Sequence, residues 1–174
     1  MAEKTIAQWY AVYVKSRYEK KTSKLLADKH IEVYLPLLNR LKQWSDRKKM
    51  VEEPLFKSYI FVRSDLKNYY DILNTPGIVR FIGFEGKPVP VPDNQIVAVR
   101  QFVGEYDDST DLDEFQNLQE GQLVEIVYGE MKGLVGRLVA LKGRQRLMVD
   151  IESVGRSIPI NISRSQVRLL QDGL

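Results

Sequence analysis

The chain has 174 residues, of which 44% are hydrophobic, with a formal net charge of +3, no cysteine and a single histidine, His30. This composition supports one ordinary domain or two small ones and excludes disulfides, thiolate metal sites and histidine-rich metal sites. No apolar run approaches the roughly 20 residues of a membrane span, and the first residues lack the order of a signal peptide. We therefore expect a soluble, cytoplasmic protein with no membrane partner, no metal and no cofactor.

The charge is distributed unevenly along the chain. Lys and Arg outnumber Asp and Glu by 18 to 12 through Tyr106, six acidic residues and no basic one lie between Asp107 and Glu120, and the remainder carries 8 basic and 5 acidic residues. The acidic stretch has too few apolar residues to offset its ordering entropy. We predict an N-terminal domain over 7–106, an acidic linker over 107–118 and a C-terminal domain over 119–171.

Strand and helix patterns alternate in the N-terminal half. β-branched and aromatic residues predict strands over 9–14, 31–37, 59–63 and 78–84. Apolar residues at helical spacing predict helices that begin near Ser16, Asp65 and Asp93, the first with a capping box between Ser16 and Glu19. The order β-α-β-β-α-β-α indicates an α+β sandwich close to the ferredoxin-like plan, with helices covering one face of a small sheet.

The C-terminal part changes to short strands separated by glycine turns. The pattern predicts five strands, over 122–127, 134–141, 147–151, 156–162 and 167–169. Five short strands in about 50 residues are typical of a small β-barrel.

The run from Pro54 to Val62 carries more aromatic rings than a single core-facing strand needs. Alternation places Phe56 and Ile60 on one side and Tyr59 and Phe61 on the other. Both faces are then hydrophobic, and two interpretations stay open. The second face is either an apolar patch that receives a partner or the far side of a strand enclosed between two helices.

Basic residues gather between the second and third predicted strands, around Trp44, in what we predict to be an extended β-hairpin. They are Arg40, Lys42, Arg47, Lys48 and Lys49. Such a hairpin suits contact with phosphates, while the alternative is a solvated loop. Lys15 and Arg17, at the start of the first helix, form a second candidate phosphate site.

The sequence has no catalytic signature, neither a phosphate-binding loop, nor a nucleophile elbow, nor an HExxH motif. His30 is placed at a helix C-terminus, where it suits the helix dipole better than it suits general base catalysis. Glu52 and Glu53 are adjacent on a strand, so their carboxylates point apart. We therefore predict that the protein is not an enzyme.

Several short motifs together resemble the NusG family of transcription elongation factors, which join a NusG N-terminal domain to a KOW domain with an SH3-like barrel. The motifs are Trp9-Tyr10, Glu19, Tyr34-Leu35-Pro36, Glu53-Pro54-Leu55-Phe56, Tyr59-Ile60-Phe61-Val62, Pro76-Gly77-Ile78-Val79 and the glycines of Gly121–Gly136. The Pro-Leu-Phe segment and the basic hairpin are more similar to the operon-specific paralogs of the RfaH and UpxY types.

The resemblance implies a transcription antitermination factor that grips the clamp helices of RNA polymerase in a hydrophobic cavity. By matching position, the cavity residues would be Tyr13, Phe56, Tyr59, Phe61, Ile82 and Phe84. The basic hairpin, Lys15 and Arg17 would then make weak contacts with upstream or non-template DNA. The target would be long operons of the polysaccharide type.

The chain departs from the family pattern at several positions. Lys57-Ser58 replaces a Pro-Gly turn, and the threonine-rich motif for a second polymerase contact is absent near Tyr69–Ile72. Gly129-Glu130-Met131 replaces Gly-Pro-Phe. At the tip of the KOW domain, where a ribosomal protein or Rho would bind, Val154 and Arg156 are present without the family's Phe, which argues against Rho. The alternative function is an RNA-binding or ribosome-associated KOW module that does not bind polymerase.

Overall fold

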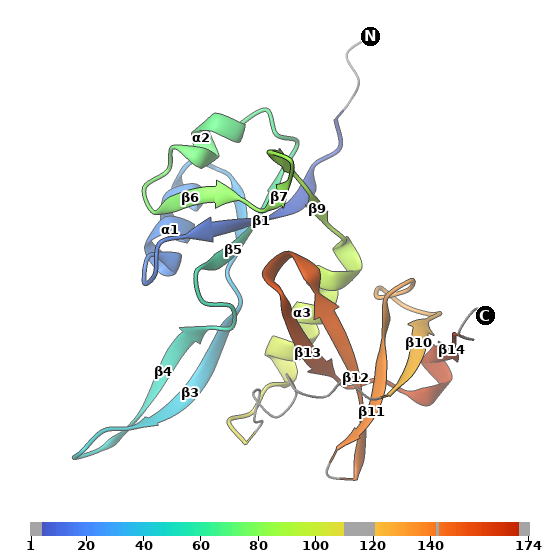
Figure 1. Cartoon of the computed structure of the whole chain (residues 1–174). Helices are drawn as coiled ribbons and strands as arrows, with labels where there is room; N and C mark the ends of the chain where they lie inside the picture. The colour runs from blue at the N-terminus through green and yellow to red at the C-terminus, as the bar shows by residue number, and fades with distance from the viewer. Residues whose placement is uncertain (1–4, 110–120, 142, 171–174) are drawn as a thin grey trace. The chain divides into compact units, whose positions relative to one another are not determined.

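The computed structural model describes residues 5–109, 121–141 and 143–170, and the chain forms two compact units (Figure 1). Unit 1 comprises Met1–Leu38 and Glu52–Pro92, and unit 2 comprises Asn39–Val51 and Asp93–Leu174. The last helix of the N-terminal half thus groups with the C-terminal barrel. The boundary placed at 106 from the sequence stays a prediction, and most of the acidic linker, 107–118, lies outside the described residues.

Unit 1 is built on an antiparallel sheet with the order β2-β5-β1-β6. Its strands are β1 (Gln8–Val14), β2 (Glu32–Tyr34), β5 (Tyr59–Ser64) and β6 (Ile78–Phe81), with α1 (Glu19–Asp28) after β1 and α2 (Tyr69–Leu73) after β5. This order and connectivity are those of the ferredoxin-like sandwich. The predicted fold class is therefore confirmed.

Short strands complete unit 1. β9 (Pro90–Val91) pairs with β1, and β7 (Gly83–Phe84) forms a small hairpin with β8 (Lys87–Pro88). The predicted strand 78–84 is therefore two strands, since β6 ends at Phe81 and Gly83 pairs with Pro88 of β8. The predicted strand 31–37 is also divided, since β2 ends at Tyr34 and β3 (Leu37–Gln43) pairs with β4 (Lys48–Pro54) instead.

One face of the unit 1 sheet is closed by the two helices. Val12, Val14, Ile60 and Val62 share this face with Tyr10, because successive strand residues point to opposite sides. Leu26 of α1 and Ile72 of α2 pack on them, and Figure 1 shows both helices beside the sheet. Full burial of such side chains contributes about 1.5–3 kcal/mol each, so this face is the core of the unit.

The connection between α2 and β6 is locked against α1 by a glycine. Thr22 donates its hydroxyl to the Pro76 carbonyl at 2.9 Å. Gly77 has φ +96°, and a Cβ there would lie 2.2 Å from Thr22 Oγ1. Both the backbone conformation and the lack of space therefore require glycine at this position.

Two helix starts differ from the sequence predictions. α1 begins at Glu19 without a side-chain cap, so the capping box predicted for Ser16 and Glu19 is wrong. α2 begins only at Tyr69, because Asp65 turns the chain by accepting a hydrogen bond from the Lys67 amide at 3.1 Å. That hydrogen bond lowers the pKa of the Asp65 carboxyl below its usual value.

The C-terminal part of unit 2 is a five-stranded antiparallel sheet with the order β13-β12-β11-β10-β14. The strands are β10 (Gln122–Ile126), β11 (Val135–Leu141), β12 (Arg144–Ile151), β13 (Arg156–Ile160) and β14 (Val167–Leu169), with short 3₁₀ turns η1 (Glu152–Val154) and η2 (Arg164–Gln166). Its interior contains Ile126, Leu147, Val149, Ile151 and Ile158, which are all fully buried or nearly so. The five predicted strands are confirmed to within a few residues at their ends.

Helix α3 (Asp93–Glu105) packs against β12 and β13 within unit 2. Gln101 Nε2 donates to the Asn161 carbonyl at 2.8 Å, and Asn161 Nδ2 donates to Glu105 Oε2 at 2.8 Å. The buried side of the helix carries Ile96, Val99 and Phe102. In the part of the chain that the structure describes, no helix has the length and apolar character to cross a membrane.

Candidate functional site

The face of the unit 1 sheet opposite the helices is lined with aromatic rings. In the β1–β5 register Tyr13 lies opposite Tyr59 and Ala11 opposite Phe61, while Tyr34 of β2 lies on the other side of Phe61. These positions alternate with those of the core, so all of them point away from α1 and α2. We call Tyr13, Tyr34, Phe56, Tyr59 and Phe61 the ring face.

The rings of this face form two groups of contacts, Tyr13 with Tyr59 and Phe61 with Phe56 and Tyr34. The centroids of Tyr13 and Tyr59 are 5.4 Å apart, edge to face. Phe61 contacts Phe56 at 6.1 Å, edge to face, and Tyr34 at 6.3 Å, stacked. Such geometries add about 0.5–1.5 kcal/mol per pair beyond area burial, so the rings hold each other in place.

Burial divides the ring face into two parts. Phe61 is 0% exposed and Phe56 3% exposed, whereas Tyr13, Tyr34 and Tyr59 are half-buried. The phenylalanines form the buried part, and the tyrosines are the part that solvent reaches. Of the six residues predicted for the cavity, the structure brings Tyr13, Phe56, Tyr59 and Phe61 together.

Phe56 lies on the same side as Phe61, which corrects the face predicted for it from alternation. The period of two holds only inside a strand, and β5 begins at Tyr59. Before it the Tyr59 amide donates to the Phe56 carbonyl at 3.2 Å, which closes a turn. Because of this turn, the Phe56 side chain lies on the opposite side from the one alternation predicts, and its ring contacts Phe61.

The same turn contains Lys57-Ser58, the dipeptide that replaces the Pro-Gly of the family pattern. Ser58 has φ 67°, the left-handed conformation that a glycine would adopt without strain. Its amide donates to Glu19 Oε1 at 2.9 Å and its carbonyl accepts from the Val14 amide at 2.8 Å. Glu19, which is buried, therefore acts as a clamp on the turn that presents the rings.

The remaining two predicted cavity residues lie beyond β6. The Ile82 amide donates to the Ala11 carbonyl at 2.9 Å, and Ile82 is half-buried. Phe84, on the β7–β8 hairpin, is 71% exposed. Phe84 therefore offers a ring to solvent outside the contact set of the ring face.

Arg80 is a site residue that the sequence interpretation missed. It lies opposite Tyr13 in the β1–β6 register, and its guanidinium is 5.8 Å from the Tyr13 ring centroid. With Tyr69 and Lys87 it also lines an open pocket of about 230 Å³. The signal that could have found Arg80 is the alternation along β6, where Arg80 and Phe81 point to opposite faces.

The predicted β-hairpin between the second and third sheet strands is confirmed as β3–β4. Lys42, Arg47, Lys48 and Lys49 are exposed and Arg40 is half-buried. Trp44 lies at the end of the ribbon and is 56% exposed. Figure 1 shows the two strands running side by side as a narrow ribbon.

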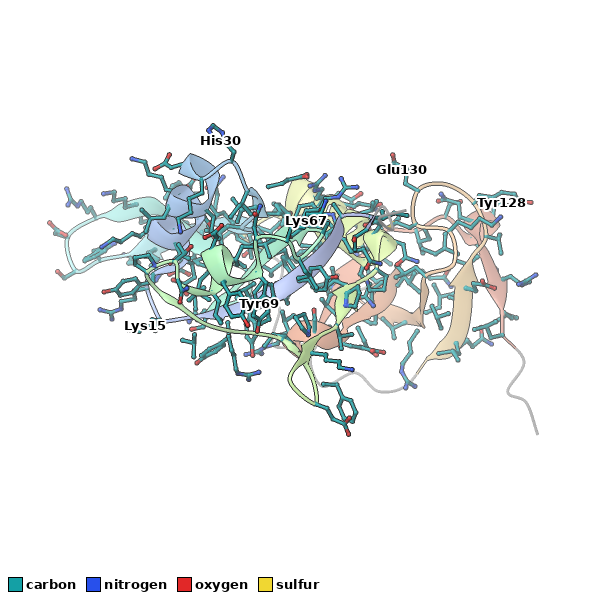
Figure 2. All side chains as sticks on the ribbon, turned by 90° about the horizontal axis from the view of Figure 1, so that it is seen from above. Lys15, His30, Lys67, Tyr69, Tyr128 and Glu130 are labelled. Carbon is teal, nitrogen blue, oxygen red and sulfur yellow. The ribbon has the colours of Figure 1, made fainter. Side chains whose placement is uncertain are left out.

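The second basic pair lies in the loop between β1 and α1. The Lys15 amide donates to the Gly77 carbonyl at 2.8 Å, and the Lys15 side chain is exposed (Figure 2). Arg17 is also exposed and has φ 67°. Both residues precede α1, which begins at Glu19, so they lie outside the helix.

His30 follows the end of α1, as predicted. It has φ 60°, its amide donates to the Ala27 carbonyl at 2.9 Å, and its ring is exposed (Figure 2). Glu52, for which a paired carboxylate was rejected, lies 3.3 Å from Lys20 Nζ in a surface ion pair.

At the predicted KOW tip, only one of the two residues presents its side chain. Val154 is 7% exposed in η1, and Gly155 follows with φ 62°. Arg156 begins β13 and is exposed. In the neighbouring loop Met131 is 8% exposed, while Tyr128 and Glu130 extend outward (Figure 2).

A ferredoxin-like α+β unit with an aromatic sheet face, followed by a five-stranded SH3-like barrel, defines a two-domain protein of the mixed α+β class. The family described as "Transcription termination factor nusG" matches residues 7–100, more than half of the chain. The chain belongs to the NusG family.

The relatives are similar over nearly their whole length. The "Transcription termination/antitermination protein NusG" of Lactococcus lactis subsp. lactis (strain IL1403) is 25% identical, with 94% of this chain and 93% of the relative covered. The protein of that name from Halalkalibacterium halodurans is 25% identical, with 91% and 96% covered. A solved structure, "Domain interaction in Thermotoga maritima NusG", has a TM-score of 0.48 at 25% identity, with 95% and 98% covered.

Proposed function

We propose that this chain is a non-enzymatic antitermination factor that binds the clamp helices of elongating RNA polymerase through its ring face. Bound there, it suppresses pausing or termination, and it serves long operons of the polysaccharide type. The family supplies the general role, since its relatives carry the name of transcription termination/antitermination proteins. The ring face is the observation that carries the specific proposal.

The ring face has the properties that recognition of a helical partner requires. A helix or helix pair docks into an apolar trough through a few aromatic anchors. Tyr13 and Tyr59 are half-buried with ring centroids 5.4 Å apart, and Phe56 and Phe61 form the buried part of the same face. Tyrosines in such a position contribute an apolar ring and a hydroxyl donor, which is why they are frequent hot spots.

Nucleic acid is the second partner that we propose. The β3–β4 hairpin and the pair Lys15 and Arg17 would contact upstream or non-template DNA through phosphates, which attract basic side chains without regard to sequence. At the barrel, Arg156 would be the contact for a ribosomal protein, because Val154 is buried. The lack of an aromatic residue at this tip argues against Rho as a partner.

Binding of the full-length protein to purified RNA polymerase tests the proposal. The double variant Tyr13→Ala/Tyr59→Ala should bind at least about 30-fold more weakly, since losing an aromatic hot spot costs about 2 kcal/mol or more. Tyr70→Ala is the matched control, because Tyr70 is a 73% exposed tyrosine of the same unit on α2. It should bind as the unchanged protein does.

Equal binding by the double variant and the unchanged protein would refute the polymerase site. The alternative, an RNA-binding or ribosome-associated module, has a different signature. It predicts binding to free RNA that weakens steeply with salt, no requirement for polymerase, and no effect of the two tyrosines. The same variants measured with polymerase and with RNA therefore separate the two functions.

A further inference from the structure

A β-bulge in β6 places Arg80 beside the ring face. Tyr13 of β1 pairs with Arg80, but the next residue, Val14, pairs with Ile78, so Val79 is an extra residue in β6. Without the bulge, Ile78 and Arg80 would share one face of the sheet, because they are two residues apart. With it, Ile78 packs against the core while Arg80 is exposed opposite Tyr13. The bulge therefore adds a cation to an otherwise aromatic surface.

The Arg80 guanidinium contacts the Tyr13 ring and keeps its hydrogen-bond donors available. Its central carbon lies over that ring, 5.8 Å from the centroid, which is within the range of a cation–π contact. Such a contact uses the charge of the guanidinium and leaves its N–H groups free to donate. Arg80 forms no ion pair with a carboxylate of the described residues. A partner that covers Tyr13 would therefore meet an unneutralised arginine.

A second cation, Lys87, lines the same open pocket of about 230 Å³ as Arg80 does. The wall of this pocket includes Tyr69 and Phe81, whose rings stack with centroids 4.9 Å apart. Lys87 directly follows the two-residue turn that joins β7 to β8, and a turn of this length holds its strands in a fixed register. We call the pocket lined by Tyr69, Arg80, Phe81 and Lys87 the edge pocket. Its lining residues include two cations and no acidic side chain.

The size and charge of the edge pocket favour one acidic side chain as its occupant. Small-molecule sites typically have volumes of about 300–1,000 Å³, and the edge pocket, at about 230 Å³, is smaller. A nucleic-acid strand needs a groove of cations that follows its backbone, whereas the edge pocket offers two. A carboxylate can accept two parallel hydrogen bonds from one guanidinium. Because Arg80 contacts Tyr13, the carboxylate would belong to the same partner that covers the tyrosine.

We propose that the edge pocket binds an Asp or Glu side chain of the helical partner that docks on the ring face, with Arg80 as the main donor and Lys87 as the second cation. This inference rests on the proposed polymerase contact and deepens it, because it assigns a charged subsite beside the apolar one. The tyrosines supply most of the affinity. The ion pair fixes the orientation of the helices on the sheet and speeds association, as complementary charges at the rim of an interface do.

Binding of the full-length protein to purified RNA polymerase, measured over a range of salt concentrations, tests the proposal. Arg80→Gln should weaken binding about 10-fold at low salt, the usual effect of losing a hydrogen bond to a charged group. The deficit should shrink as the salt concentration rises. Lys67→Gln is the matched control, because it removes the same charge from a 75% exposed side chain between β5 and α2. It should bind as the unchanged protein does.

Charge reversal identifies the carboxylate on the partner. Arg80→Glu should weaken binding more than Arg80→Gln does, since two like charges would then face each other. Each Asp and Glu of the clamp helices is replaced in turn by Lys. One replacement should weaken binding of the unchanged protein and restore binding of Arg80→Glu. If Arg80 only held the Tyr13 ring in place, no such rescue would occur, and circular dichroism checks that each variant folds.

Unchanged polymerase binding by Arg80→Gln, a deficit that does not depend on salt, or the lack of any rescuing Lys replacement would overturn the proposal. Weaker binding of Arg80→Gln to a DNA duplex, with polymerase binding unchanged, would assign the pocket to phosphates and overturn it as well. The double variant Tyr13→Ala/Tyr59→Ala is measured in parallel. If it loses polymerase binding and Arg80→Gln does not, only the edge pocket is rejected. If it binds normally, the ring-face function is rejected and the edge pocket with it.

Discussion

The two faces of the unit 1 sheet are built from neighbouring residues yet differ in side-chain type and burial. The helix-covered face presents Val12, Ile60 and Val62, which are fully buried. The ring face presents Tyr13 and Tyr59, which are half-buried. Aliphatic β-branched residues fill a closed core. Rings with hydroxyl groups suit a surface that contacts water in the free protein and would be buried when a partner binds. Substitutions on the two faces should therefore differ in whether stability or binding is lost.

Ile60→Ala should have the largest effect on stability. Ile60 is 0% exposed, so the truncation leaves a cavity in the core and should lower the free energy of unfolding by about 2–5 kcal/mol. Tyr59→Ala, one residue earlier on the opposite face, should cost less stability but weaken polymerase binding. Urea denaturation of both variants, with the polymerase titration, checks the contrast. Equal loss of stability in the two variants would contradict the distinction between a closed core face and a solvent-accessible ring face.

Gly77→Ala should have the second-largest effect on stability, because Gly77 directly precedes β6 and packs against Thr22 of α1. The added Cβ would lie 2.2 Å from Thr22 Oγ1 at a φ of +96°. We expect a loss of about 1–3 kcal/mol in the free energy of unfolding. Gly86→Ala is the control, since Gly86 also has a positive φ but no atom lies within 4 Å of its Cβ position. A difference between the two variants measures the steric part alone.

Ser58→Gly should stabilise the protein. Ser58 has φ 67°, and the left-handed conformation costs a residue with a Cβ about 1–2 kcal/mol. Part of this gain is lost because glycine is more flexible in the unfolded chain. The net rise should be about 0.5–1 kcal/mol in urea denaturation, without loss of polymerase binding. A decrease in stability would contradict the assignment of backbone strain to Ser58, because glycine keeps both backbone hydrogen bonds of the turn.

Tyr70→Ala should have the smallest effect. Tyr70 is 73% exposed and lies on α2, on the helix side of the sheet. Its removal should change the free energy of unfolding by no more than about 0.5 kcal/mol, which is typical of surface positions. The melting temperature of this variant checks the expectation. A loss of several kcal/mol in the free energy of unfolding would contradict the expectation that an exposed residue on this side of the sheet contributes little to stability.

Most of the fold could be predicted from the sequence because the strands carry strong local patterns. The ferredoxin-like order and all five barrel strands followed from alternation and glycine turns. Capping was predicted less well. The sequence paired Ser16 with Glu19, but Glu19 instead accepts from the Ser58 amide at 2.9 Å, a contact between residues 39 apart. Local pattern cannot reveal a partner that only the tertiary fold brings near.

The candidate site shows the same limit. Tyr13, Tyr59 and Phe61 lie together because they are inside strands, where the period of two is reliable. Phe56 was assigned to the wrong side because a turn separates it from β5. Alternation along β6 places Arg80 on the face opposite Phe81, but the pairing that brings it beside Tyr13 depends on the register of two distant strands.

Site-specific photo-cross-linking tests the central claim most directly. A benzophenone amino acid at position 59, on the ring face, should form a product with elongating RNA polymerase that maps to the clamp helices. The same group at position 70, on α2, should give no such product. The account is contradicted if position 59 yields no polymerase product, or if both positions cross-link to the clamp helices equally.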